Sequence, residues 1–188
     1  CVLPFRDGSF DRVTMLDIIE HLNPEQLDSM VKEVRRILKP NGYAVIHTLP
    51  NRWVYDIGYT FLRMMYRRLP TDPRSQIEKQ VHINEQDLPT LSKTLEDCGF
   101  SYRIWLEQKI PAQARWQKSV NRYNDNRDIV YPKLAGFVGR LVELLSFGPF
   151  KLILCNDIYG LLWKGERPTT APRLPSAIIE RLTCSLLR

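Results

Sequence analysis

The chain has 188 residues, a length that fits one domain with a modest extension. Apolar residues make up 44% and charged residues 26%, which is typical of a globular chain that can bury a core. Lys and Arg number 27 against 21 Asp and Glu, so the net charge is +6. This charge permits contact with phosphates or anionic lipid but does not require it.

The cysteines and the hydropathy pattern exclude several classes of protein. The four cysteines are scattered and form no C-x-x-C pair, so we expect free thiols, no disulfide framework and no metal site. No run of about 18 apolar residues predicts a transmembrane helix, and no secretory signal is visible. We therefore expect a cytoplasmic protein, with peripheral attachment to a membrane as the alternative.

The first part of the chain predicts a strand, a helix and a second strand. "SFDRVTML" at 9–16 is typical of a short buried strand. Asn23 and Pro24 predict the N-cap and first residue of a helix, whose apolar face carries Leu27, Val31, Val34 and Leu38. "KPNG" at 39–42 should end it, with Asn-Gly at positive φ, before a strand at 43–48. This order indicates a βαβ unit and a parallel sheet.

Two amphipathic helices and a strand are predicted next. The segment 53–68 has an apolar stripe and a cluster of arginines, which favours a helix. A second helix is predicted within 82–100, with Asp87 as its effective start because Pro89 is awkward in a helix interior. Gly99 suits the positive-φ exit from this helix. Alternating apolar residues then predict a strand at 101–107.

The last third of the chain mixes irregular and regular segments. Residues 109–133 are polar and irregular, and 134–147 return to helical periodicity up to Gly148-Pro149. A final strand is predicted at 158–164. Residues 165–188 predict a Pro-rich linker followed by a short, frayed helix.

Three motifs occur in order: "LPFRDGSFDRVTMLDIIEHL", "EVRRILKPNGYAVIHTLPN" and "HINEQDLPTLSKTLEDCGF". With them the chain resembles the later part of a class I S-adenosylmethionine-dependent methyltransferase of the type 11 (ubiquinone-biosynthesis-like) group. The motifs cover about residues 3–107, and 158–164 fits the final strand of that family. The resemblance implies an α/β, Rossmann-like methyltransferase fold with inserted helices, of which this chain supplies strands four to seven, the last antiparallel.

The resemblance also implies S-adenosyl-L-methionine as the cofactor, held in the family by a Gly-rich turn after the first strand. No G-x-G-x-x-G motif occurs here, and the nine glycines are isolated. Ligands bind such sheets where the strand order reverses, which in this fold lies between the first and fourth strands. We therefore expect the chain to contribute only one wall of that crevice. We also expect the strand at 9–16, the fourth strand of the family fold, to be an exposed apolar edge.

These expectations define the domain organisation. Residues 1–164 are interpreted as the C-terminal part of a methyltransferase domain, with insertions at about 53–80 and 109–150, and 165–188 as the linker and helix. The missing N-terminal half of the domain is the expected partner. Without it, the isolated chain is expected not to bind S-adenosylmethionine usefully and to be inactive.

The resemblance assigns cofactor contacts to two groups of residues. Met15, Leu16 and Asp17, at the carboxyl end of the predicted fourth strand, would lie beside the methionine part of the cofactor. Leu3, Pro4 and Phe5 would shape the adenine side. The structural alternatives are an ordinary strand end and a packed loop.

Candidates on the acceptor side are fewer. His21 is a weak candidate for a catalytic base because it is titratable and near the strand end, and its alternative is a structural histidine bonded to the following loop. Asn51, Trp53 and His82 are candidates for the substrate side. His47 is expected to be buried in its strand without a functional role.

The function predicted from this resemblance is methyl transfer to a small-molecule or lipid-like acceptor. The two insertions carry aromatic and basic residues: Trp53, Tyr59, Tyr66, Arg67, Arg68, Trp116 and Tyr123. An ordinary amphipathic helix packed on the sheet is the preferred interpretation of these residues, and a lid for such an acceptor, with its basic apolar helix on a membrane surface, is the alternative. A non-catalytic, methyltransferase-like scaffold that needs a partner is the alternative function. No nucleic-acid-binding motif appears, so a nucleic acid partner is not expected.

Overall fold

The computed structural model describes residues 2–65, 67, 71–72, 74, 76–107, 144–145 and 147–187. Four strands form one sheet: β1 (Phe10–Leu16), β2 (Leu38–Thr48), β3 (Ser101–Glu107) and β4 (Asp157–Trp163). Their order is β1-β2-β4-β3, with β1 and β2 parallel and β4 antiparallel to both of its neighbours. The predicted α/β class and the antiparallel last strand are confirmed.

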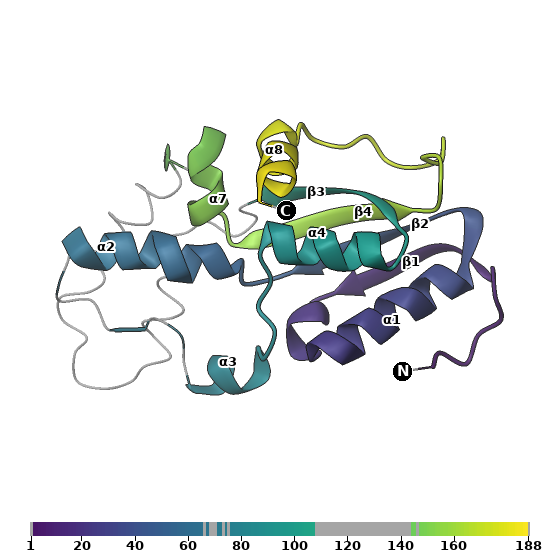
Figure 1. Cartoon of the computed structure of the whole chain (residues 1–188), viewed down its shortest axis with the longest axis horizontal. Helices are drawn as coiled ribbons and strands as arrows, with labels where there is room; N and C mark the ends of the chain where they lie inside the picture. Colours follow the sequence, from purple (N-terminus) through teal and green to yellow (C-terminus); the bar gives the residue numbers. More distant parts are fainter. Residues whose placement is uncertain are drawn as a thin grey trace.

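The longer helices among the described residues are α1 (Pro24–Ile37), α4 (Leu88–Asp97) and α8 (Ile178–Leu186) (Figure 1). They pack against the sheet, α8 beside β3. Short helical segments gather where β1 and β2 end: η1 (Ile19–His21), the π-helical η2 (Val54–Tyr59), α2 (Thr60–Met65), α3 (Gln76–Val81), η3 (Gly148–Phe150) and α7 (Lys151–Leu154). Among the helices that the structure describes, none is long and apolar enough to cross a membrane.

Helix α1 starts where the sequence predicts. The Asn23 side chain accepts a hydrogen bond from the Gln26 backbone N–H, and the Gln26 side chain accepts one from Asn23 in return. This capping box satisfies two backbone donors that the first turn leaves unpaired. Pro24 occupies the first helical position, where a missing N–H costs nothing.

The turn predicted at 39–42 is wrong, because β2 begins at Leu38 directly after α1. Gly42 does not adopt a positive φ. It is required for another reason: a Cβ there would lie 2.8 Å from the backbone oxygen of Asp11 in β1. The glycine therefore permits close approach of β1 and β2 beside the register shift between Phe10 and Arg12.

The predictions for the middle of the chain are confirmed in part. Asp87 caps α4 through the Thr90 N–H, Gly99 leaves α4 at φ 77°, and β3 has the predicted bounds. The helix predicted at 53–68 is present as η2 and α2. Helix α3 and the pair η3–α7 were not predicted, since they are too short to show a period. The predicted irregular segment 109–133 and most of the helix at 134–147 lie outside the described residues.

The core lies on both faces of the sheet. On one face the buried side chains come from the sheet and from α1, α4 and α8, and include Ile46, Leu91, Leu95 and Leu162. On the other face a smaller cluster is closed by Ala171, Leu174 and Ala177 of the segment before α8: it contains Tyr43, Trp105 and Leu161. The segment after β4 therefore packs on the sheet, and α8 contributes the buried Cys184 rather than fraying.

Strand β1 lies at one edge of the sheet. It pairs only with β2 among the described strands, which confirms the expected edge position. Met15 is its one buried residue, and Leu16 is 52% exposed. The prediction of a buried strand is therefore wrong for this structure, because one face and one edge of β1 have no cover among the described residues.

Candidate functional site

The carboxyl ends of β1 and β2 meet at one end of the sheet (Figure 1). Segment η1 follows β1 there, and the loop to η2 follows β2. A bridge between Asn51 and Gln86 fixes the approach to α4 beside them. Open α/β sheets bind ligands at this end, so it is the candidate site.

Asp17 forms the first feature of this site. Its φ of 53° is uncommon for a residue with a side chain, although Asp tolerates it better than most residues. Its backbone N–H donates to the His47 carbonyl at 3.0 Å, and its Oδ1 lies 2.6 Å from His47 Nδ1. Because 56% of the Asp17 side chain is exposed, its carboxylate can reach a ligand while bound to His47.

His47 lies between two carboxylates. Its Nε2 is 3.4 Å from Asp157 Oδ1, an ion-pair contact rather than a well-directed hydrogen bond, and its ring lies 4.4 Å from that of Tyr159. Asp157, and after it Asp17, raise the pKa of His47 above its ordinary value, although burial opposes them. The site thus holds a histidine that binds its proton more tightly than a free histidine does.

A second pair of histidines lies on the other side of η1. The His21 and His82 rings are 5.0 Å apart, and His21 Nδ1 lies 2.8 Å from the carbonyl oxygen of Val81. His21 is therefore bonded to backbone, but its partner is Val81 at the end of α3 and not the loop that directly follows His21. The structure also brings both histidines next to Glu20, which the sequence did not place in the site.

The two substrate-side candidates after β2 differ in their surroundings. Asn51 has no exposed surface, and its side-chain amide donates to the carbonyls of Leu152 and Cys155. Its Oδ1 accepts from the Trp53 N–H. Asn51 therefore holds η2 and α7 together rather than facing a ligand, whereas Trp53 is partly exposed.

The six predicted cofactor residues do not come together. Phe5 packs edge-to-face on Phe10, the first residue of β1, with ring centroids 4.9 Å apart. The seven residues of β1 span roughly 20 Å at about 3.3 Å per residue, so Phe5 lies far from Leu16 and Asp17. Leu3 forms hydrogen bonds with side chains in the last turns of α1. Pro4, between Leu3 and Phe5 in the chain, is exposed.

Arg36 of α1 holds Leu3 and Phe5 in this position. It donates to the carbonyls of Leu3 and Phe5 and to the carboxylates of Asp7 and Glu33. Its hydrogen bonds, with that of the Leu3 N–H, lower the pKa of Glu33 to about 2. The first residues are thereby held at the amino end of the sheet.

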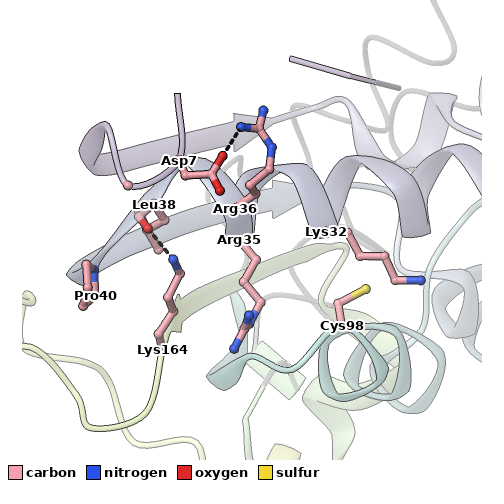
Figure 2. Close-up of a pocket in the computed structure, with 9 residues that line it drawn as sticks. Asp7, Lys32, Arg35, Arg36, Leu38, Pro40, Cys98 and Lys164 are labelled. Carbon is pink, nitrogen blue, oxygen red and sulfur yellow. Dashed lines mark hydrogen bonds and ion pairs between the residues drawn. The ribbon is translucent and has the colours of Figure 1, made fainter. Parts of the chain in front are cut away.

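A basic pocket of about 600 Å³ also lies at the amino end (Figure 2), lined by Asp7, Gly8, Lys32, Arg35, Arg36, Leu38, Pro40, Cys98 and Lys164. Two of its cations are neutralised: Arg36 by Asp7 and Glu33, and Lys32 by Asp28. Burial raises the pKa of the Cys98 thiol to about 11, which makes it a poor nucleophile. This pocket is at the wrong end of the sheet for the ligand position of the fold.

His47, Asp157 and Glu20 are neighbours of the site that were not predicted from the sequence. His47 and Asp157 are on strands whose pairing is antiparallel, where His47 faces Tyr159. The sequence holds part of the signal, because His47 and Asp157 are titratable residues within the otherwise largely apolar strands β2 and β4. The contact between them depends on the register in which β2 pairs with β4. These strands are more than 100 residues apart, so no local sequence pattern predicts the contact.

The match to a family and a curated relative concerns the start of the chain. Residues 1–46 match the family described as "Methyltransferase domain". A 55-residue segment is 36% identical to an uncharacterized methyltransferase of Synechocystis sp., and it covers 28% of this chain and 26% of that protein. The predicted resemblance to class I S-adenosylmethionine-dependent methyltransferases is confirmed on this segment.

Solved structures extend the similarity to the fold of most of the chain. A chain from the complex of the Haloferax volcanii Trm112 methyltransferase activator with a methyltransferase is 13% identical, with a TM-score of 0.50 over 87% of this chain and 58% of that one. A methyltransferase from Archaeoglobus fulgidus, described as SAM-dependent, is 19% identical with a TM-score of 0.47, over 86% and 62%. The fold is the Rossmann-like methyltransferase fold, and the chain spans less than two thirds of these relatives.

Proposed function

We propose that this chain is part of an S-adenosylmethionine-dependent methyltransferase that acts on a small-molecule or lipid-like acceptor. The observation that carries the proposal is the matched segment 1–46, which includes β1, η1 and α1 and ends in β2. This segment brings Asp17 to the carboxyl end of an edge strand, with its side chain accessible. Further strands beside β1 would complete the crevice in which this fold binds ligands.

The residues present fit one wall of a cofactor site. Leu16 and Asp17 are exposed at the end of β1, and Met15 anchors the strand in the core below them. When bound, the cofactor supplies a methyl group that is activated by a sulfonium charge. The task of the chain is then to hold the acceptor in line with that methyl group, since positioning alone can lower such a barrier by several kcal/mol.

The acceptor side is proposed to include Trp53 and His82, which lie on the segments after β2 and α3 and are partly exposed. Beside Trp53, η2 and α2 expose apolar side chains: Ile57 is 48%, Phe61 63% and Met64 73% exposed. Exposed apolar side chains on a short helix favour a lipid-like acceptor or contact with a membrane surface. The same surface would pack against protein in the alternative, a scaffold that pairs with a partner.

Binding of S-adenosylmethionine tests the proposal. The 188-residue chain and a version extended by any sequence encoded before Cys1 should be compared by isothermal titration and by transfer of a radioactive methyl group. We expect binding to the extended version only. Binding to neither would favour the scaffold, and micromolar binding to the shorter chain would contradict the need for further strands.

The substitution Asp17→Asn in the extended version locates the site. It removes the carboxylate charge but keeps the size and the tolerance for positive φ. We expect affinity for the cofactor to fall by roughly tenfold, since charged hydrogen bonds contribute about 1.5–3 kcal/mol. Asp11→Asn at the other end of β1 is the matched control and should leave the affinity unchanged.

A further inference from the structure

Three potential metal ligands from two separate segments converge next to the end of β1. They are Glu20 and His21 of η1 and His82, which follows α3. One ligand atom from each lies within 4.8 Å of the other two. A tetrahedral Zn²⁺ ion with bonds of about 2.1 Å holds neighbouring ligand atoms roughly 3.4 Å apart, so side-chain rotations that bring these atoms closer by about 1 Å would close the site.

The orientation of His21 favours a role as a ligand. Its Nδ1 lies 2.8 Å from the carbonyl oxygen of Val81, and a carbonyl can only accept, so Nδ1 carries the proton. The lone pair is then on Nε2, which lies 3.9 Å from Glu20 Oε1. A histidine that donates one ring N–H to a backbone carbonyl and binds with the other nitrogen is the usual arrangement at metal sites.

Glu20 supplies the second argument, because its charge is buried with little compensation. The residue is 1% exposed, and its Oε2 accepts a 2.6 Å hydrogen bond from the Thr48 hydroxyl. Its nearest ion-pair contact in the described part of the chain is His21, beyond hydrogen-bond distance. A buried carboxylate is costly unless it is paired or bound to a metal, so a cation between Glu20 and His21 would offset this cost.

The backbone holds the two segments together independently of any ion. The Asn84 N–H donates to the Glu20 carbonyl at 3.1 Å, two residues beyond His82. His21 joins the same pair of segments through Val81. The ligands therefore sit on a preformed frame, and 42% of the His21 side chain is exposed, which leaves a path from solvent.

We propose that Glu20, His21 and His82 bind a divalent transition-metal ion, with Zn²⁺ as the best-suited probe. Two imidazoles and one carboxylate suit such ions, whereas Mg²⁺ prefers oxygen ligands. Three protein ligands leave an open position for water or for an oxygen of a bound molecule. This site does not depend on the proposed methyl transfer, and it replaces the expectation of no metal drawn from the cysteine spacing.

Direct titration of the metal-stripped chain with Zn²⁺ tests the proposal, with Mg²⁺ as the comparison ion. Co²⁺ absorption in the visible range reports whether the bound ion has a low coordination number, and the variants identify the ligands. We expect Zn²⁺ but not Mg²⁺ to bind, and the affinity for Zn²⁺ to fall at least about 100-fold in His82→Gln and in Glu20→Gln. His47→Gln is the matched control, because it removes the one remaining histidine and the alternative pairing with Asp17 and Asp157, and should bind as the parent does.

Thermal unfolding with and without Zn²⁺ is the second readout. Ligand that binds only the folded state raises the unfolding midpoint, so the rise should occur in the parent and in His47→Gln and be absent in His82→Gln. If Glu20→Gln does not fold, His82→Gln still tests the proposal, because His82 is partly exposed and its substitution should not prevent folding. Absence of binding to the parent, equal binding by His82→Gln, or loss confined to His47→Gln would each overturn the proposal.

Discussion

The two edges of the sheet are built in opposite ways. At the β3 edge, Ile104, Trp105 and Leu106 are buried. At the β1 edge, four of the seven residues are exposed and Met15 alone is buried. Both are edge strands among the described residues, so position in the sheet does not explain the difference.

Helix α8 packs against β3, and this contact explains why β3 is more buried than β1. Glu180 of α8 accepts a 3.1 Å hydrogen bond from the Leu106 backbone N–H, and its carboxylate also pairs with Lys151 at 2.5 Å. An outward N–H of β3 is thus satisfied by a side chain, which closes the edge. Strand β1 has no such cover in the described part of the chain. Among the described residues, the sheet is therefore closed at its β3 edge and open for pairing at its β1 edge.

The largest expected effect comes from opening the closed edge. Glu180→Ala removes a buried carboxylate and leaves the Leu106 N–H and the Lys151 ammonium without it. Breaking a buried pair costs about 3–5 kcal/mol, and urea denaturation should show a loss in this range. Arg181→Gln, on the exposed side of α8, should stay within about 0.5 kcal/mol. Equal effects of the two changes would mean that α8 does not close β3.

A smaller effect is expected where the open edge meets the sheet interior. Gly42→Ala would place a methyl group 2.8 Å from the Asp11 backbone oxygen, so β1 must shift away from β2. Overpacking of this kind costs about 1–3 kcal/mol, measured as the free energy of unfolding. Gly8→Ala is not a matched control, because Gly8 has a positive φ. Asn41→Ala, next to Gly42 and exposed, should have a much smaller effect.

The pH dependence of stability tests how the end of β1 is tied to β2. A raised pKa means that folded His47 holds its proton more tightly than the unfolded chain, whose ordinary value is about 6.5. This contribution is complete below that value and is lost as pH rises through the folded-state pKa. Urea denaturation across this range should therefore show a steeper decline for the parent than for His47→Gln. Parallel pH profiles would contradict the Asp17–His47–Asp157 arrangement.

The smallest effect is expected on the open edge itself. Thr14 is exposed in the middle of β1, so Thr14→Lys should change the free energy of unfolding by no more than about 0.5 kcal/mol. A lysine on an unpaired edge should also reduce self-association, measured by analytical ultracentrifugation. A loss of several kcal/mol would show that another part of the protein covers this strand.

Much of the local structure could be predicted from the sequence. Asn23 and Asp87 start their helices because their side chains accept from backbone donors three residues later, a rule that needs no tertiary contact. Gly99 ends α4 at positive φ for an equally local reason. The motifs around β1 also indicated the family and the position of Asp17.

The site could be predicted only in part. Asp17 was named, but its partner His47 was expected to be buried without a functional role, and Phe5 was grouped with Asp17 as a cofactor contact although β1 separates the two. The interaction of His47 with Asp157 could not be predicted because it depends on pairing between β2 and β4. The position of Phe5 could not be predicted because Arg36 binds the first residues through backbone carbonyls, which the sequence of a loop does not reveal.

The capped helices, the approximate positions of the strands and the methyltransferase-like opening segment could be predicted from the sequence, because they depend on residues within a few positions of each other. Which edge of the sheet is closed, and which titratable groups meet, depends on contacts between distant segments. Glu180 lies 74 residues from Leu106, and His82 lies 61 from His21. Such contacts follow from packing of the whole sheet, where burial and strand register, rather than local propensity, select the partners.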